Sequence, residues 1–361
     1  MYPWSRLDTT RILLMSVVLF SCSVTHHTQP FQAGQALEPT TEGEKRLWHS
    51  AAKAETTFIK SKRIHHDPGL RDYLQAVMDR LFPEFDGKIR VKMIKDPNFR
   101  AFALPNGSVY VSTGLLAALD NEAQLATVLA HEGIHFINRH AAIQKANVSV
   151  GISRPHEKEA DLLGRKRVLA AGYDVRQAHE IFRYVSVQEK VYWDVTPEMP
   201  SLHPPTKERI RYFQSLNAST AHHSNKMAET AYRQHVDGLR QTVLQEKLET
   251  GHYDEIIAVL TDKDLASRYG ETGRFYLAEA YRLRDREDDH KKAIIAYHAA
   301  IESCPDFAPT YRSLGMVYLK SKKFKDAAEF LGRYMALEPA AEDKAFVEQY
   351  LKQARYGGNE E

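Results

Sequence analysis

The chain has 361 residues, a length that favours two or three domains. Hydrophobic residues make up 43% of it and aromatic residues 10%, which supplies enough apolar surface for packed cores and excludes extensive disorder. The 49 basic and 47 acidic residues leave a net charge of +2, and no basic stripe follows a predicted helix. The sequence therefore argues against a nucleic acid or another polyanion as a partner.

The N-terminus resembles a bacterial export signal. Two arginines precede an apolar run over residues 12–20, which is about half the length that spans a bilayer. The run closes with residues 19–22, Leu-Phe-Ser-Cys, which resemble a lipobox in which Cys22 accepts the lipid. Small residues at positions 21 and 23 leave an ordinary cleavage site as the alternative. With Ser23 after the cysteine, we expect a lipoprotein in the periplasm that is anchored to the outer membrane.

The next part of the chain combines helices with two short strands. Residues 23–42 are polar, have no hydrophobic period and are predicted to be a flexible tether. Apolar spacing then predicts helices over 43–62 and 68–82. Two alternating stretches, 89–94 and 108–111, predict strands, with a Pro-Asn-Gly turn before the second. We expect these strands to form a small antiparallel sheet.

From about residue 113 onward the pattern is almost entirely helical. Asn121 is predicted to cap a long helix, with Gln124 at the reciprocal position of a capping box. This helix carries the sequence His-Glu-Gly-Ile-His at 131–135. Ser153 and Pro155 predict the start of a further helix, because serine caps helix N-termini and proline is tolerated at the first helical position.

The C-terminal third of the chain contains a repeat. Residues at tetratricopeptide-repeat spacings are Leu314, Gly315, Tyr318, Phe324, Ala327 and Pro339, and one unit earlier Leu277, Ala278, Tyr281, Ala293, Tyr297, Ala300 and Pro305. The second helices of these units are 34 residues apart (327 − 293), which is the period of this repeat. A degenerate third unit is expected near Gly251, and a generic helical bundle is the alternative.

The five residues 131–135 suit metal chemistry. His131 and His135 are four residues apart, so a helix places both on one face and lets their imidazoles bind one zinc ion at about 2.0–2.1 Å. Glu132 lies about 100° around the helix, where it can reach a water at that ion and take its proton. In a chain with 17 histidines the pattern arises by chance with odds of roughly one in twenty, so a third ligand is needed to support it.

Residues 153–161 offer that third ligand. Glu157 and Asp161 are again four residues apart on one helix face, so Glu157 can bind metal while Asp161 accepts the second N–H of a ligating histidine. The alternative is an exposed acidic helix start, which the helix dipole favours. Four other histidines match no ligand position and are interpreted as solvated side chains: His65, His66, His140 and His156.

Several motifs follow one another in a fixed order. They are His131–His135 (H-E-x-x-H), Ser153–Asp161 (S-R-x-x-E-x-E-A-D), Ala171–Asp174 (A-G-Y-D) and His203–Ile210 (H-P-P-T-x-x-R-I). This series resembles the metallopeptidase family that includes HtpX and the CAAX prenyl proteases, and the C-terminal repeats make the layout similar to its BepA-like periplasmic members. Residues 100–107 and the strand after them resemble the active-site edge strand of that family. We therefore expect a polypeptide substrate to bind as an added strand along 107–112.

The resemblance also implies roles for individual residues. It implies a catalytic zinc, with Glu132 as general base and three protein ligands: His131, His135 and Glu157. Asp161 is implied as the support of a ligating histidine. His203 either stabilises the oxyanion or occupies the open zinc position and holds the enzyme inactive. Arg209, six residues later, is implied as an oxyanion partner.

Three features of this sequence depart from the family pattern. Arg100 stands where the family usually has Asn, in the segment that resembles the edge strand. Gly133-Ile134 reverses the usual order, in which an aliphatic residue precedes a small one. A glycine costs about 1 kcal/mol in a helix interior. The 22 residues from His135 to Glu157 (157 − 135) also form a shorter connection than in most relatives. We expect a more open cleft, or one that another segment covers.

The predicted fold class is mainly α, with an α+β, gluzincin-like peptidase domain that contains a small antiparallel sheet, followed by an α-helical tetratricopeptide solenoid. The predicted boundaries are 1–22 for the signal peptide, 23–42 for the tether, 43–220 for the peptidase domain and 221–361 for the repeats. We expect a zinc-dependent endopeptidase of the cell envelope that degrades misfolded or stalled envelope and outer-membrane proteins and docks a protein partner through its repeats. The alternative is a chaperone or scaffold whose zinc site is structural or self-inhibited.

Overall fold

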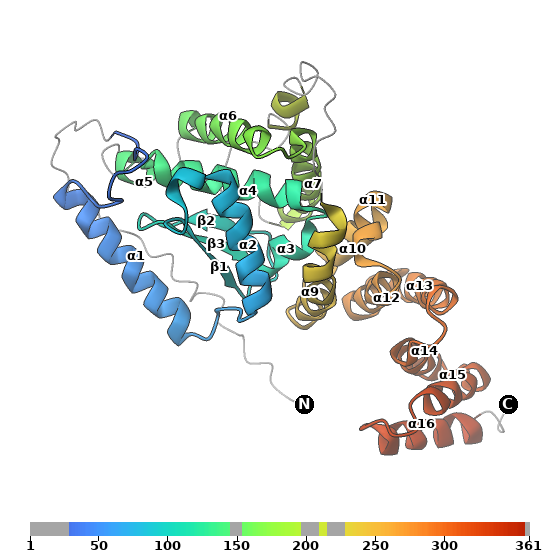
Figure 1. Ribbon diagram of the computed structural model, residues 1–361. Coiled ribbons are helices and arrows are strands. Elements are labelled where there is room, and N and C mark those ends of the chain that lie inside the picture. The colour runs from blue at the N-terminus through green and yellow to red at the C-terminus, as the bar shows by residue number, and fades with distance from the viewer. Residues whose placement is uncertain (1–28, 145–153, 196–208, 215–227, 358–361) are drawn as a thin grey trace.

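The computed structural model describes residues 29–144, 154–195, 209–214 and 228–357. The predicted signal peptide with Cys22, the cap at Ser153 and the motif residue His203 lie outside the described residues. The described chain is mainly helical and contains one three-stranded sheet (Figure 1). Within the described residues, no helix combines the length and the apolar character needed to cross a membrane.

The elements follow one another in two groups. The first group is α1 (Glu42–Lys60), α2 (Pro68–Leu81), β1 (Arg90–Ile94), β2 (Ala101–Ala103), β3 (Ser108–Ser112), α3 (Thr113–Ala118), α4 (Glu122–Ile137), α5 (His140–Gln144), α6 (Arg154–Ala170) and α7 (Ala178–Val195). The second group is α9 (Glu229–Glu249), α10 (Tyr253–Thr261), α11 (Lys263–Ala266), α12 (Gly273–Arg284), α13 (Asp289–Ser303), α14 (Ala308–Lys320), α15 (Phe324–Leu337) and α16 (Lys344–Gly357). The two helices predicted over 43–62 and 68–82 are confirmed within two residues at each end.

Local capping interactions explain where the long helices begin. Thr41 caps α1 and exchanges the two reciprocal hydrogen bonds of a capping box with Glu44. At α4 the side chain of Asn121 accepts from the backbone N–H of Gln124 at 3.0 Å, as predicted. The Gln124 side chain in turn accepts from the N–H of Asp120, one residue earlier than the capping box predicts.

The sheet has the strand order β1–β3–β2 and mixed directions. β3 runs parallel to β1, with Val91 opposite Val109, and antiparallel to β2, with Ala103 opposite Val109. The prediction of an antiparallel sheet is therefore wrong for β1. After β1 the chain crosses to the far edge, forms β2 and returns through a turn at Gly107, whose φ is +82°, into the central position.

The central place of β3 changes where another strand can pair. Both edges of β3 are occupied, so the prediction that a substrate strand is added along 107–112 is wrong. The outer edge of β1 is covered in part, because His65 N–H donates to the Met93 carbonyl at 3.0 Å and Val91 N–H donates to Gln75 Oε1 at 2.9 Å. β2 is the other edge strand of the described sheet, and it pairs with β3 alone.

The sheet lies between two helical layers. Val109 and Val111 of β3 belong to the main core, which α2 and α4 complete on one face. Tyr110 points to the other face, because successive strand residues alternate sides, and its ring lies 5.1 Å from that of Phe58 on α1. Figure 1 shows α1 crossing the sheet on the side away from α4. The core thus supports α4 directly.

α9 packs into the same core from the side of α3. Tyr232 Oη donates to the carbonyl of Leu116 at 2.6 Å, and Arg240 donates to the carbonyls of Ala117 and Leu119 at 3.2 and 2.8 Å. Tyr232 is fully buried in the main core. This helix follows the predicted domain boundary at residue 220, which itself stays a prediction.

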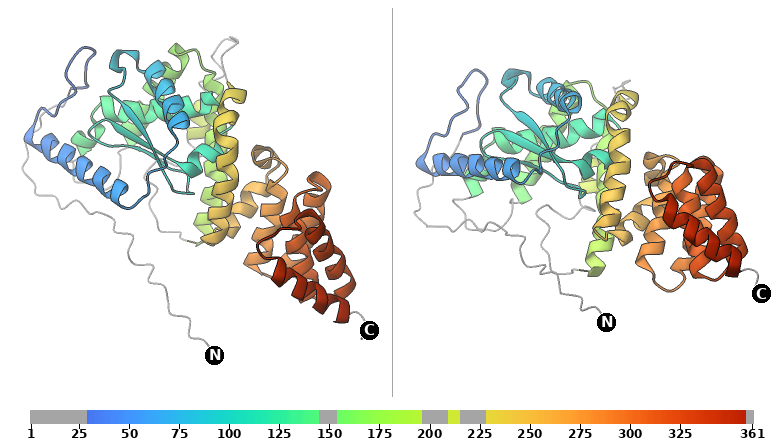
Figure 2. Two further views of the ribbon diagram at one scale, coloured as in Figure 1. Left: turned by 60° about the horizontal axis from the view of Figure 1, so that its bottom comes forward. Right: turned by 90° about the horizontal axis from the view of Figure 1, so that it is seen from below.

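The last five helices form a row that extends away from the sheet, as both views in Figure 2 show. α12 packs against α13 and α14 against α15, with α16 on the last pair. Tyr297 and Leu314, two of the residues in the predicted repeat, are fully buried between these helices. Helical hairpins are therefore present where the repeat predicts them, while their identity as tetratricopeptide repeats stays a prediction.

Candidate metal centre

α4 carries three of the predicted site residues in its last two turns. His131, Glu132 and His135 are 8%, 6% and 6% exposed. Glu122 fixes the beginning of this helix, because its carboxylate accepts hydrogen bonds from Tyr73 Oη at 2.7 Å and Tyr173 Oη at 2.5 Å. The A-G-Y-D motif that contains Tyr173 therefore holds the start of α4 in place.

α6 crosses α4 at close range and supplies the two acidic residues. At the crossing point Gly164 faces the backbone of α4, where an added Cβ would lie 3.2 Å from the backbone nitrogen of His131. A larger residue at 164 would push the two helices apart. The crossing places Glu157, which is fully buried, and Asp161 beside the two histidines.

Three ligand atoms converge between α4 and α6. The Nε2 atoms of His131 and His135 are 3.0 Å apart, and the Glu157 carboxylate oxygens lie 3.5 Å from the first and 3.4 Å from the second. A tetrahedral zinc with bonds of about 2.0–2.1 Å would separate its ligand atoms by about 3.3–3.4 Å. The two imidazoles and one carboxylate therefore fit a catalytic zinc, and among the described residues they form the one cluster with the spacing of a metal site.

Asp161 and Arg209 extend the cluster behind His131. The Asp161 carboxylate lies 3.0 Å from Nδ1 of His131, and Arg209 donates to the same carboxylate from Nε at 3.0 Å and from Nη2 at 2.5 Å. Asp161 occupies the supporting position that the sequence predicts for it. Arg209 lies on Asp161 rather than free beside the metal ligands, and we infer that it orients this carboxylate. The oxyanion role predicted for Arg209 has no support in these contacts.

The cluster shifts the pKa values of its members in opposite directions. Burial acts to lower the pKa of His131, but the hydrogen bonds with Asp161 and Glu157 outweigh it and raise that pKa to about 9. Burial keeps the pKa of His135 below its ordinary value. For Asp161, burial acts upward, but His131 and Arg209 hold the pKa of the carboxyl below its usual range. Asp161 is therefore ionised near neutral pH and can accept the Nδ1–H of His131.

His140 also belongs to this cluster, although the sequence interpretation leaves it solvated. It is 1% exposed, and its Nδ1 lies 2.9 Å from Nδ1 of His135. The interpretation is wrong for His140 because the chain reverses at Asn138 and Arg139 and folds His140 back beneath α4. His156 is partly buried and stacks on His140, with ring centroids 4.4 Å apart. In the sequence, the feature that points to this contact is a histidine five residues after the H-E-x-x-H motif, at position 140.

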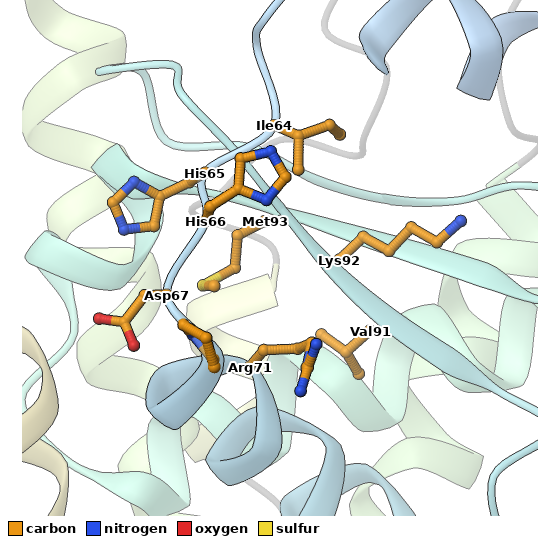
Figure 3. A pocket seen from close by; sticks show the side chains of 9 residues that line it. Ile64, His65, His66, Asp67, Arg71, Val91, Lys92 and Met93 are labelled. Carbon is orange, nitrogen blue, oxygen red and sulfur yellow. The ribbon is translucent and has the colours of Figure 1, made fainter.

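The remaining predicted histidines lie elsewhere. His65 and His66 line a small hollow of about 120 Å³ beside β1, together with Asp67, Arg71 and Met93 (Figure 3). Burial lowers the pKa of His65. Neither side chain joins the metal cluster. His203 lies outside the described residues, so its two predicted roles stay predictions.

Comparison with known proteins finds a similar peptidase family. Residues 66–151 and 142–217 match, in two overlapping segments, the model of peptidase family M48. Residues 66–217 are thus similar to peptidase family M48. This M48 segment contains both site helices, α4 and α6, and Arg209. The family, together with the names of the relatives below, supports a metalloendopeptidase.

Curated relatives are similar to part of this chain. The mitochondrial metalloendopeptidase OMA1 of Schizosaccharomyces pombe is 29% identical, over 46% of this chain and 59% of the relative. The protein of the same name from Arabidopsis thaliana is 28% identical, over 35% and 31%. The beta-barrel assembly-enhancing protease of Yersinia pestis is 22% identical, over 61% of this chain and 54% of the relative. The chain thus spans less than two thirds of the length of each of these relatives.

Proposed function

We propose that this chain is a zinc-dependent endopeptidase that degrades misfolded or stalled polypeptides in the bacterial cell envelope. The observation that carries the proposal is the buried convergence of His131, His135 and Glu157, with Glu132 on the same helix. A site that only stabilised the fold would have no use for a second, non-ligating carboxylate at this position. The match of residues 66–217 to the M48 family supports the same chemistry.

Some residues of the site would bind zinc, and Glu132 would transfer protons. When bound, zinc supplies a Lewis acid that polarises a peptide carbonyl and makes water more acidic. Glu132 accepts the proton of the attacking water and returns it to the amine that leaves when the peptide bond breaks. Asp161 holds His131 through Nδ1, so that its Nε2 faces the metal position. The apolar core around α4 limits the access of bulk water.

We further propose that the substrate pairs with the outer edge of β2. An extended polypeptide can add to a free sheet edge through backbone hydrogen bonds, which do not depend on particular side chains. β2 is one of the two edge strands of the described sheet, and the outer edge of the other, β1, is covered in part by His65 and Gln75. β2 also contacts α4, which carries the site. Such a binding mode suits unfolded chains of varied sequence.

The envelope location rests on the N-terminal sequence and on one relative. Residues 19–22 resemble a lipobox, and the Yersinia pestis relative is named for enhancing beta-barrel assembly. That match covers more of this chain than the two mitochondrial matches do. We propose that a lipid on Cys22 anchors the protein to the outer membrane, and that the C-terminal helices bind a protein partner.

The direct test compares the wild type with Glu132→Gln on casein, an unfolded polypeptide. We expect the wild type, loaded with one zinc per chain, to cleave casein, and Glu132→Gln to retain zinc but lose about 10²–10⁴-fold in rate, because the general base is missing. Glu249→Gln, an exposed substitution on α9, should cleave like the wild type. Cleavage that survives Glu132→Gln would contradict the proposed enzyme.

The same assay separates the alternative function. If no variant cleaves although each binds one zinc, the chain is better explained as a chaperone or scaffold with a structural site. His203→Ala addresses self-inhibition, because a histidine that occupied the open zinc position would release activity when it was removed. A gain of activity in His203→Ala would support that role.

A further inference from the structure

His140 has no role in the chemistry proposed above, yet the fold buries it against a metal ligand. It begins α5, and its side chain is 1% exposed. Its ring stands at 77° to the ring of His135, with centroids 4.9 Å apart, so its edge rather than its face meets the ligand. An edge contact brings nitrogen toward nitrogen, and the two Nδ1 atoms are 2.9 Å apart.

A fixed turn between α4 and α5 produces this contact. Arg139 adopts the left-handed conformation, with φ of +56°, which costs a non-glycine residue about 1 kcal/mol or more. Its guanidinium holds the turn, because it donates to both carboxylate oxygens of Glu44 and to the Thr40 hydroxyl. It also lies over the Phe31 ring, 4.7 Å from the centroid. The beginning of α1 and the segment before it therefore fix the position of His140.

The hydrogen-bond partners of the two rings fix where the protons lie. Nε2 of His140 is 3.2 Å from a carboxylate oxygen of Glu159, and a carboxylate accepts, so His140 donates from Nε2. A neutral imidazole has one proton, which leaves Nδ1 of His140 as an acceptor. His135 must then donate from its own Nδ1. Its Nε2 is left with a lone pair, which faces His131 and Glu157.

We propose that His140 is a positioning residue of the metal centre, which accepts the Nδ1–H of His135 and so fixes the tautomer whose Nε2 can bind zinc. This inference rests on the proposed zinc site. Asp161 does the same for His131, so each ligating histidine has its own acceptor. For His135 that acceptor is a second imidazole, which Glu159 holds in the matching tautomer.

The first test reads the tautomer of His135 directly and needs no change at His140. Long-range ¹H–¹⁵N spectra distinguish a protonated from an unprotonated ring nitrogen, and His135→Gln assigns the signal by removing it. In zinc-free, full-length wild type we expect His135 to carry a proton on Nδ1 and none on Nε2. A His135 without a proton on Nδ1 would overturn the proposal.

The second test compares two replacements of His140 in the full chain. His140→Leu fills the space but cannot accept a hydrogen bond, whereas the side-chain oxygen of His140→Asn can take the place of Nδ1. Competition with a chelator should show zinc affinity weakened about 10–100-fold in His140→Leu and within about 3-fold of the wild type in His140→Asn. His235→Leu, on α9 and stacked on Tyr73, controls for the loss of a histidine and should bind zinc as the wild type does.

The outcomes separate this inference from the zinc site on which it rests. If the leucine and asparagine variants lost zinc affinity equally, His140 would act only by packing and not as a hydrogen-bond acceptor. If both kept the affinity of the wild type, His140 would have no role in zinc binding. Thermal unfolding of each variant shows whether the fold persists. If the wild type bound no zinc, the proposed function would fail, while the tautomer of His135 would still decide whether His140 fixes that ring.

Discussion

At the scale of single residues, the reversed pair Gly133-Ile134 has a steric explanation. Gly133 faces the ring of Phe82, which follows α2 and is 1% exposed. A Cβ added at 133 would lie 2.6 Å from Cζ of that ring, well inside contact distance. Ile134 instead fills the main core and is 3% exposed. The small residue thus stands where α4 meets an aromatic ring, directly beside the proposed base Glu132.

Gly133→Ala should therefore destabilise the protein even though alanine favours helices. We expect the loss from overpacking against Phe82 to exceed the gain in helix propensity and to lower the free energy of unfolding by about 1–3 kcal/mol. Gly238→Ala is the matched control, because that helical glycine of α9 has no atom within 4 Å of an added Cβ. It should be neutral or stabilise by up to about 1 kcal/mol. Equal thermal midpoints for the two variants would contradict this explanation.

The role of a residue is easier to predict from the sequence when its contacts are with residues close to it along the chain. His131, His135, Glu157 and Asp161 follow from spacings of four residues, because helix geometry is local. Arg209 contacts Asp161 across 48 residues, and no spacing rule connects them. Its predicted oxyanion role came from the family resemblance and missed the side chain that it binds.

At the scale of elements, the turn after α4 depends on the beginning of α1. Glu44 and Arg139 form a buried ion pair, 5% and 9% exposed, across 95 residues. Burial acts to raise the pKa of Glu44, but hydrogen bonds from Arg139 and Thr40 outweigh it, so that pKa lies below the ordinary 4.5. A lowered carboxyl pKa stabilises the fold above about pH 4.5, and this contribution is lost as the pH falls through the folded-state value.

Glu44→Gln should expose this dependence. At pH 7 the variant leaves Arg139 with a neutral partner, and we expect a loss of about 1–3 kcal/mol in the free energy of unfolding. As the pH falls from about 4.5 through the lowered pKa of Glu44, the wild-type carboxyl becomes protonated as well, so the difference between the two proteins should shrink. Urea unfolding at pH 7, 5 and 3.5 measures this difference in the free energy of unfolding. A difference that stays constant with pH would show that the charge of Glu44 is not involved.

Elements with strong local signals were predictable, and their arrangement was not. The capping residues Thr41 and Asn121 and the apolar period mark helix starts within the sequence itself. β2 has three residues, too few for an alternating pattern, so only the family resemblance of residues 100–107 pointed to a strand there, and none was predicted as a separate element. Without it, the central place of β3 and its parallel pairing with β1 could not be foreseen.

At the scale of the molecule, α9 connects the M48 segment to the C-terminal helices. Three backbone carbonyls at the end of α3, those of Leu116, Ala117 and Leu119, accept hydrogen bonds from Tyr232 and Arg240 of α9. The residue between them, Ala118, accepts from Arg268, which comes from beyond α11. The repeat period predicts the helical hairpins because it is local, whereas these contacts span more than 100 residues and leave no periodic signal.

The central claim is that one zinc ion binds between α4 and α6, and native mass spectrometry tests it most directly. For purified wild type we predict one zinc per chain, held by His131, His135 and Glu157. Glu157→Gln should lose that zinc, while Glu249→Gln on the surface of α9 should retain it. A wild type without zinc, or a Glu157→Gln variant that binds zinc as tightly as the wild type, would contradict the account.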